Sequence, residues 1–285
     1  MQKFVNVQTV NLRSAPSTEG NEPIGQLSLG QSVELLDGGQ PGWHRVKTQV
    51  DGKDVEGFCV EGLTDGRISW TTAKQPTLRD PASPARETLA ATAAEQWLLF
   101  RKGEGKENVE PFSSMVGKMW KAFNKNLTGK DQGMPWSAVA ISLMVRNAAK
   151  SVPGYKAFPE SIGHSKYMWD SIRKAASGDT AAPFWGVALD KAKPQVGDII
   201  GSWRNTPFSF QQFQAATRNP ETPCHSDIVV AVGPDLVLAI GGNIKHSVYA
   251  TGYQVTSDGF LTPNRRIDVG GKVVGEAVVL MANRV

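Results

Sequence analysis

Ser137 is the side chain of this sequence whose type and position best suit nucleophilic chemistry. It follows Pro135 and Trp136 and precedes the apolar run 138–145, which has almost no polar face and therefore predicts a buried helix. The first turn of a helix stabilises negative charge that develops nearby, as it does during attack on a carbonyl. Such a hydroxyl needs a general base, and we expect His225, at the start of an apolar strand, to supply it.

Two residues are candidates for the group that orients the imidazole of His225. Asn243 ends the next predicted strand, whereas Asp227 lies two positions after His225 on the same strand, so that both side chains face the same way. The neighbouring Cys224 points to the opposite face and is a poor candidate for the nucleophile. Each assignment has a structural alternative: a helix N-cap for Ser137, a packed histidine for His225, an arginine pair for Asp227 and a turn for Asn243.

Three further side chains are expected to line the substrate cleft: Trp136, His164 and Tyr167. A packing role would suit His164 and Tyr167 equally. A zinc site is an alternative for which the sequence has no close-set motif; its ligands would be His164, His225, Asp227 and His246. We therefore expect no metal and no cofactor. The sequence also has no Gly-x-Ser-x-Gly elbow, phosphate-binding loop or dinucleotide fingerprint, which weakens lipase-type, nucleotidase and dehydrogenase readings.

The elements that must position these residues change in character along the chain. Ser83-Pro84 is typical of a helix start, with serine as N-cap and proline at the first helical position. A second helix is predicted over 112–123. Apolar strands separated by Gly, Pro and Asp follow at 196–200, 225–232 and 237–243. Helices followed by an antiparallel sheet predict an α+β domain.

The first 64 residues read as short strands separated by turns, which is typical of a small β-barrel. The succession VNLRSAP, IGQLSLGQSVELL, GWHRVK and GFCVEGL resembles the bacterial SH3 family. The side chains expected to fill this barrel are Leu12, Leu27, Val33, Trp43, Val46 and Phe58. The resemblance implies a module that binds cell-wall peptides or holds a catalytic neighbour. We expect a linker over 65–83 and a second domain over 84–285.

Residues 84–285 resemble the papain-like NlpC-type and CHAP-type cell-wall peptidases and amidases, and look most like an uncharacterised bacterial domain family related to them. The likeness rests on PWSAVAIS, FPESIGHSKYMWDSI, VGDII and HSDIVVAV. It implies a buried helix packed on an antiparallel sheet and an amidase or peptidase acting on peptidoglycan stem peptides. NlpC-type enzymes carry cysteine where this chain has Ser137. A catalytically inactive scaffold that binds cell wall or a partner protein is therefore the alternative, and acyl transfer is a third hypothesis.

Composition and charge are those of a soluble globular protein with an ordinary solvated surface. The 285 residues carry a net charge of +4, and the two cysteines have no zinc or disulfide pattern. No run of basic residues indicates nucleic-acid binding, and no apolar stretch is long enough to span a membrane. The N-terminus lacks the apolar segment of a signal peptide. We therefore expect action at the cell wall or in the periplasm after non-standard export, as a phage lysin or secreted antibacterial effector, with muropeptides and an immunity or secretion-apparatus protein as partners.

Overall fold

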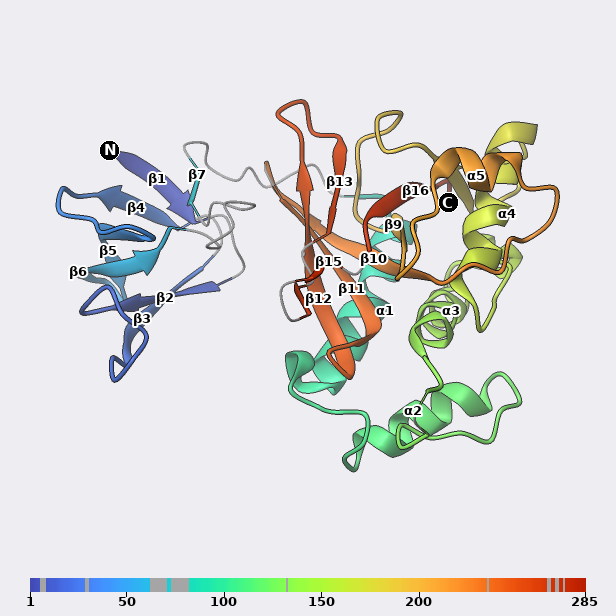
Figure 1. The fold of residues 1–285 in the computed structure, drawn as a ribbon, viewed down its shortest axis with the longest axis horizontal. Coiled ribbons are helices and arrows are strands. Elements are labelled where there is room, and N and C mark those ends of the chain that lie inside the picture. The colour runs from blue at the N-terminus through green and yellow to red at the C-terminus, as the bar shows by residue number, and fades with distance from the viewer. Residues whose placement is uncertain are drawn as a thin grey trace. The chain divides into compact units, whose positions relative to one another are not determined.

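The computed structural model describes residues 1–5, 9–28, 31–61, 71–72, 82–131, 133–234, 236–265, 268–269, 272–273 and 275–285. The chain divides into two compact units (Figure 1). The first comprises residues 1–79 with 233–236, and the second comprises 80–232 with 237–285. The division at residue 79 falls inside the segment 65–83 that we expected to be a linker. Among the described residues, no helix is long and apolar enough to cross a membrane.

The first unit is an antiparallel sheet whose strands have the order β3-β2-β6-β5-β4-β1-β7. The strands are β1 Gln2–Val5, β2 Thr9–Arg13, β3 Pro23–Ser28, β4 Ser32–Leu35, β5 Trp43–Val50, β6 Lys53–Val60 and β7 Thr71–Thr72. The longest hairpin joins β5 to β6 through the turn at Asp51-Gly52, where both residues have positive φ. This arrangement confirms a small β unit at the N-terminus.

The core of the first unit corrects the expected filling at two positions. Leu12, Leu27, Val33 and Val46 are buried as expected. Trp43 and Phe58, however, are partly exposed, whereas Cys59 is fully buried. Side chains alternate between the two faces of a strand, so β6 places Cys59 inside and the neighbouring Phe58 on the other face.

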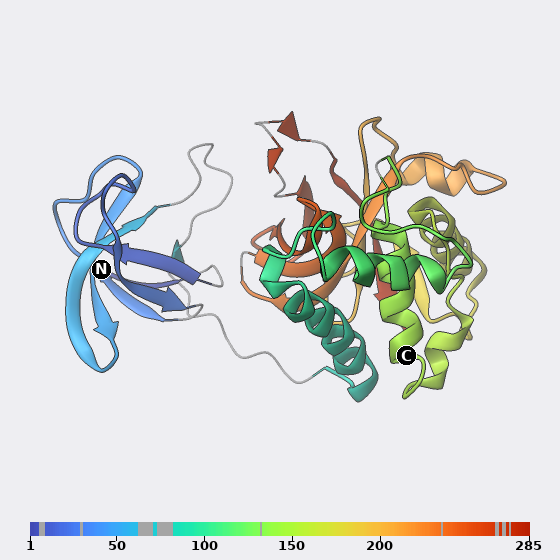
Figure 2. The ribbon, with the colours of Figure 1, turned by 90° about the horizontal axis from the view of Figure 1, so that it is seen from below.

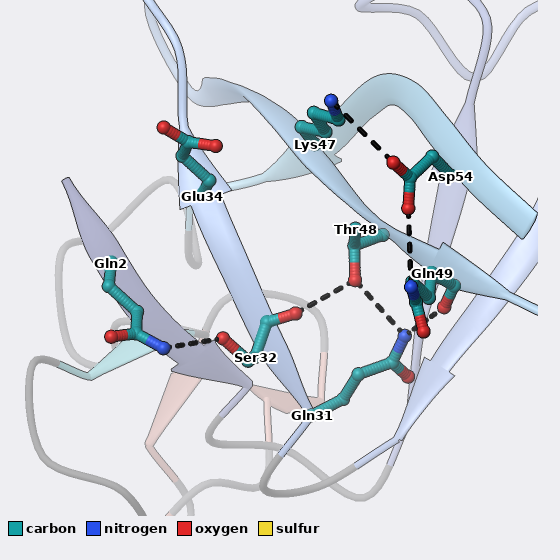
Figure 3. Close-up of a pocket in the computed structure, with 8 residues that line it drawn as sticks. All are labelled: Gln2, Gln31, Ser32, Glu34, Lys47, Thr48, Gln49 and Asp54. Carbon is teal, nitrogen blue, oxygen red and sulfur yellow. Dashed lines mark hydrogen bonds and ion pairs between the residues drawn. The ribbon is translucent and has the colours of Figure 1, made fainter. Parts of the chain in front are cut away.

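One polar groove of about 700 Å³ lies on the first unit along β1, β4 and β5 (Figure 3). Its wall is a chain of hydrogen bonds between amides and hydroxyls. Nε2 of Gln31 donates to Oγ1 of Thr48 at 3.2 Å, and that hydroxyl donates to the backbone oxygen of Ser32 at 2.8 Å. At one edge, Nζ of Lys47 lies 3.7 Å from Oδ2 of Asp54. The groove therefore offers hydrogen-bonding groups of both kinds to a polar ligand.

The second unit begins with helices, as expected from the sequence. They are α1 Pro84–Leu99, η1 Arg101–Gly103, α2 Phe112–Lys121, α3 Ser137–Ala148, η2 Pro153–Ala157, α4 His164–Ser177 and α5 Phe210–Ala215. The side chain of Ser83 accepts a hydrogen bond from the backbone N–H of Arg86, with Pro84 at the first position, which confirms the predicted start of α1. Helix α3 is buried on nearly all sides and packs against α1 (Figure 2).

A curled antiparallel sheet covers these helices, with the strand order β13-β12-β11-β10-β9-β16-β8 (Figure 1). The strands are β8 Phe184–Val187, β9 Ile199–Trp203, β10 Cys224–Val232, β11 Leu236–Ile244, β12 Ser247–Val255, β13 Leu261–Arg265 and β16 Ala277–Asn283. A separate pair is formed by β14 Asp268–Val269 and β15 Lys272–Val273. Helices followed by an antiparallel sheet confirm the α+β class.

The Gly-Asp turn before β9 ties the first helix to the sheet. Nη1 of Arg86 on α1 lies 2.8 Å from Oδ1 of the buried Asp198. The same carboxylate accepts the backbone N–H groups of Gln195 and Asn283, at 2.7 and 2.9 Å. Burial raises the pKa of Asp198, and the adjacent Arg86 opposes that rise. The VGDII motif therefore has a structural role, since it joins α1, β9 and β16.

Candidate active site

Ser137 is the first residue of α3, and its hydroxyl faces a histidine. Oγ of Ser137 and Nε2 of His164 lie 2.6 Å apart, both buried. Trp136, not Ser137, occupies the N-cap position, and no side chain caps this helix end. The capping alternative for Ser137 is therefore wrong, and its hydroxyl is directed to a group that can exchange a proton with it.

The other ring nitrogen of His164 meets two hydroxyl groups. Nδ1 lies 2.7 Å from Oγ of Ser226 and also contacts the phenol of Tyr167, which is itself 2.8 Å from Oγ of Ser226. His164 and Tyr167 lie three residues apart in the first turn of α4 and so share one face of that helix. Burial raises the pKa of Tyr167 well above its usual value. The phenol therefore keeps its proton near neutral pH.

Two tautomers of His164 satisfy these contacts. When Nδ1 carries the proton and donates it to Ser226, the lone pair of Nε2 is free to accept the hydroxyl proton of Ser137. When Nε2 carries the proton, it donates to Ser137, and Nδ1 accepts from Tyr167 or Ser226. The first tautomer is the one that general-base catalysis requires.

A second histidine pair lies directly beside this network. Nε2 of His225 and Oδ1 of Asp227 are 2.7 Å apart, and the phenol of Tyr253 donates a hydrogen bond to Oδ2 of the same carboxylate. The ring centroids of His164 and His225 are 5.1 Å apart, with their planes at 43°. Asp227 has no exposed surface. Its carboxylate is therefore satisfied by two protein donors close to the Ser137–His164 pair.

The two networks lie on opposite faces of strand β10, because successive side chains of a strand alternate between its faces. Ser226 contacts α4, whereas its neighbours His225 and Asp227 share the other face of the strand with Tyr253. Gly241 on β11 makes room for that pair. A Cβ atom at Gly241 would lie 1.8 Å from Oδ1 of Asp227 and 3.0 Å from Nε2 of His225. Glycine is therefore required at this position if the carboxylate is to stay where it is.

The structure redistributes the roles that the sequence suggested. We expected His225 to contact Ser137, but the hydrogen bond of the Ser137 hydroxyl goes to His164, which sequence reasoning had placed along the cleft. Of the two candidates for orienting His225, Asp227 makes the contact. Asn243 has a positive φ of 55° near the end of β11, and its side chain has no hydrogen bond to His225 within the described residues.

The three side chains expected in a substrate cleft are buried. Trp136 is 1% exposed, stacks on Phe100 and donates its indole N–H to Glu107, so it packs in the core. Tyr167 and His164 belong to the hydrogen-bonded network instead. The signal that could have found them was the spacing of Ser161, His164 and Tyr167, which places the imidazole and the phenol on one face of α4.

His246 and the cysteines lie outside the network. Nδ1 of the exposed His246 is 2.8 Å from Oε1 of Glu107. Burial raises the pKa of the Cys59 thiol to about 11 and that of Cys224 to about 12. Neither thiol is therefore ionised near neutral pH. In the part of the chain that the structure describes, no three His, Cys, Asp or Glu side chains gather in a way that could hold a metal ion.

The site is closed in this conformation. Ser137 is 2% exposed and His164 is 5% exposed, while Ser226 and Tyr167 have no exposed surface. The Ser137 hydroxyl is therefore closed off from solvent in this conformation. The chemistry that the arrangement permits is proton transfer from Ser137 to His164 at the positive end of α3.

Comparison with known families shows to which family the chain belongs. Residues 92–273, more than half of the chain, match a family described as "Uncharacterized protein conserved in bacteria (DUF2272)". The chain belongs to the DUF2272 family. No curated protein matches it. The family match covers α2, α3, α4 and strands β8 to β13, and thus all the residues of both histidine networks.

Two solved structures are similar to this DUF2272 chain, both from Trichomonas vaginalis. The first is NlpC2, with 13% sequence identity, 99% of this chain and 73% of that chain covered, and a TM-score of 0.24. The second is NlpC1, with 14% identity, coverage of 92% and 68%, and a TM-score of 0.20. At such scores the two structures establish no common fold with this chain.

Proposed function

We propose that this DUF2272 protein is a serine-dependent amidase or peptidase that cleaves peptidoglycan stem peptides. The observation that carries the proposal is the pair formed by Ser137, at the first position of the buried helix α3, and Nε2 of His164, 2.6 Å away. A nucleophile and a base at hydrogen-bonding distance, with further hydroxyl groups holding the base, form the minimal arrangement for acyl transfer.

In the proposed reaction, the Ser137 hydroxyl attacks the carbonyl carbon of an amide while its proton passes to Nε2 of His164. The negative charge on the carbonyl oxygen develops near the first turn of α3, whose backbone N–H groups have no partners within the helix. His164 then returns the proton to the leaving amine, and an acyl-Ser137 ester remains. Water, deprotonated by His164, hydrolyses that ester and restores the serine.

In this scheme, positioning roles belong to Ser226, to Tyr167 and to the pair formed by His225 and Asp227. In the tautomer that catalysis needs, Nδ1 of His164 donates its proton to Ser226, and Tyr167 can donate its phenol proton to the same hydroxyl. The carboxylate of Asp227 contributes negative charge beside the two neighbouring, tilted imidazole rings. Negative charge at that distance favours the imidazolium that forms when His164 takes the proton.

The substrate class rests on the likeness of the sequence to cell-wall enzymes and on the first unit. That unit is small and all-β, its sequence resembles bacterial SH3 modules, and its polar groove carries amide, hydroxyl and carboxylate groups (Figure 3). We assign it the role of binding wall peptide or positioning the second unit. With that substrate, we propose action at the cell wall or in the periplasm, as a lysin or as an exported effector with an immunity partner.

A second candidate function is a non-hydrolytic scaffold that binds cell wall or a partner protein. The burial of Ser137, which is 2% exposed, favours it, as does a serine at the position where NlpC-type enzymes use a thiol. Under this alternative the two histidine networks hold the helices to the sheet and carry out no turnover. Sacculus binding that persists in Ser137→Ala, without release of fragments by the wild-type protein, would support it.

The experiment is digestion of purified sacculi, with the soluble fragments identified by mass spectrometry. We expect fragments from the wild-type protein and none above background from Ser137→Ala. The matched control is Ser142→Ala, which removes a buried hydroxyl on the same helix that bonds the backbone of Ser161. Equal release by the wild-type protein and Ser137→Ala would reject the hydrolase.

Two histidine variants test which ring is the base. Loss of a general base lowers a rate by about 10²–10⁴-fold. We expect His164→Asn to fall in that range and His225→Asn to retain more activity, because the ring of His164 contacts the Ser137 hydroxyl. The opposite order would return the role of base to His225.

A further inference from the structure

A cavity of about 210 Å³ lies on the second unit, beside the candidate active site. One wall is a face of α4, where Tyr167, Asp170 and Lys174 follow one another at helical spacing. The opposite walls come from the segments around Phe158 and Phe184, whose ring centroids are 5.7 Å apart. The cavity therefore combines aromatic walls with ionisable groups, three of which lie on α4.

The charged side chains of this cavity differ in the hydrogen bonds and ion pairs that they make. Nζ of Lys174 is 2.8 Å from Oδ2 of Asp179, and the other oxygen of that carboxylate accepts the backbone N–H of Ala181 at 3.0 Å. Asp170 is half-buried, and its carboxylate accepts no hydrogen bond from any residue that the structure describes. Burial raises the pKa of Asp170, and Lys174 and Lys166 oppose the rise. The three charges that line the cavity sum to −1, with the unmatched one on Asp170.

We propose that this cavity binds a short alkyl chain ending in a primary ammonium group, with the ammonium on the carboxylate of Asp170. Partial burial of a carboxylate that accepts no hydrogen bond is costly, and a charge-assisted hydrogen bond from an ammonium offsets that cost. The aromatic walls bury the methylene groups. At about 30 Å³ per water, 210 Å³ holds about seven water-sized groups, which is enough for a butylammonium chain.

The site deepens the proposed function, on which its biological assignment rests: the occupant would be the side chain of a diamino acid in a stem peptide. Tyr167 connects the two places, because it lines the cavity and its phenol contacts Nδ1 of His164. Binding of an ammonium-bearing side chain would thus place the peptide against the helix that carries the base. Binding of a ligand in the cavity does not require that the protein catalyse a reaction.

The test is a titration of the full chain with n-butylammonium chloride at constant ionic strength, followed by ¹⁵N–¹H NMR. The neutral isostere n-butanol is the matched ligand. The variants are Asp170→Asn and the control Asp190→Asn, which removes an exposed carboxylate that pairs with Lys191. We expect saturable shifts centred on α4, affinity at least tenfold weaker in Asp170→Asn, and unchanged affinity in Asp190→Asn.

Each of the other outcomes would overturn the proposal of an ammonium-binding site. Equal affinity of n-butanol and n-butylammonium would make the cavity merely apolar, and equal affinity of Asp170→Asn would remove the carboxylate from the interaction. The titration is repeated in Ser137→Ala, which does not touch the cavity. Because this readout requires no catalysis, failure of the sacculus digestion and failure of ammonium binding are observed separately.

Discussion

Replacing Gly241 by alanine should disrupt the buried carboxylate pair without altering any polar side chain. The new Cβ atom would lie 1.8 Å from Oδ1 of Asp227, far inside van der Waals contact, so that the carboxylate must move. Asp227 would then lose its contacts with His225 and Tyr253. Each hydrogen bond to a charged group contributes about 1.5–3 kcal/mol, so the two together stabilise the fold by about 3–6 kcal/mol.

This loss is large compared with the stability of a typical domain, about 5–15 kcal/mol. For a unit the size of residues 80–232 with 237–285, each kcal/mol shifts the melting temperature by about 2–4 °C. We therefore expect Gly241→Ala to lower the transition of the second unit by at least about 6 °C in scanning calorimetry. The transition of the first unit should stay where it is, which provides an internal control.

The matched substitution is Gly163→Ala, which adds the same methyl group at the N-cap of α4. There the nearest atom to a new Cβ is Oγ of Ser161 at 4.0 Å, and φ is −129°. Alanine is a poorer N-cap than glycine, with an expected cost of no more than about 1 kcal/mol. A Gly241→Ala protein as stable as Gly163→Ala would refute the reasoning, because the carboxylate pair would then contribute nothing measurable.

Three further outcomes are expected. Tyr167→Phe should lower fragment release about fivefold and change its pH profile, since a net hydrogen bond of about 1 kcal/mol that holds His164 is lost; an unchanged rate and profile would remove the phenol from the site. Arg86→Met should destabilise the second unit by about 3–5 kcal/mol in urea, because it leaves the Asp198 carboxylate buried without its cation, and Asp198→Asn in the same chain should recover part of that loss. Cys224, with a pKa raised to about 12, should resist iodoacetamide at pH 8 in the folded protein and react once the protein is unfolded. Because the folded thiol holds its proton more tightly than the unfolded thiol, its contribution to stability is complete below about pH 8.5 and declines towards pH 12.

Local signals predicted the elements of the second unit. Ser83 and Pro84 define the start of α1 through a cap that depends on neighbouring residues alone. The start of α3 at Ser137 followed from a run too apolar for any exposed face. The class of the fold followed from the order of these elements. None of these inferences needed knowledge of distant contacts.

Long-range register was the information that the sequence lacked. In the first unit, Phe58 was expected among the side chains that fill the barrel, whereas the pairing of β6 buries Cys59. Strand pairing decides which of two adjacent residues faces the core, and a shift of one residue exchanges them. The type of a side chain alone does not say which of the two neighbours faces inward.

The same distinction explains why one histidine network was foreseen and the other was not. Alternation along a single strand suffices to bring Asp227 to His225, and the structure has that contact. His164 and Tyr167 share a face of α4, but the serines they meet lie on α3 and β10, so their meeting depends on how three elements dock. The alternation of side chains along β10 also limits which histidine can meet Ser137.

His225 and Ser226 are neighbours on β10 and therefore face opposite sides of the sheet. Ser137, at the start of α3, packs on the face of the sheet to which Ser226 points. The proposed base must therefore come from a helix on that face, and α4 supplies one. The carboxylate then acts across the strand, through adjacent rings 5.1 Å apart rather than through a direct hydrogen bond. In the proposed reaction its effect on a proton at His164 is electrostatic, and release of sacculus fragments should fall less in Asp227→Asn than in His164→Asn.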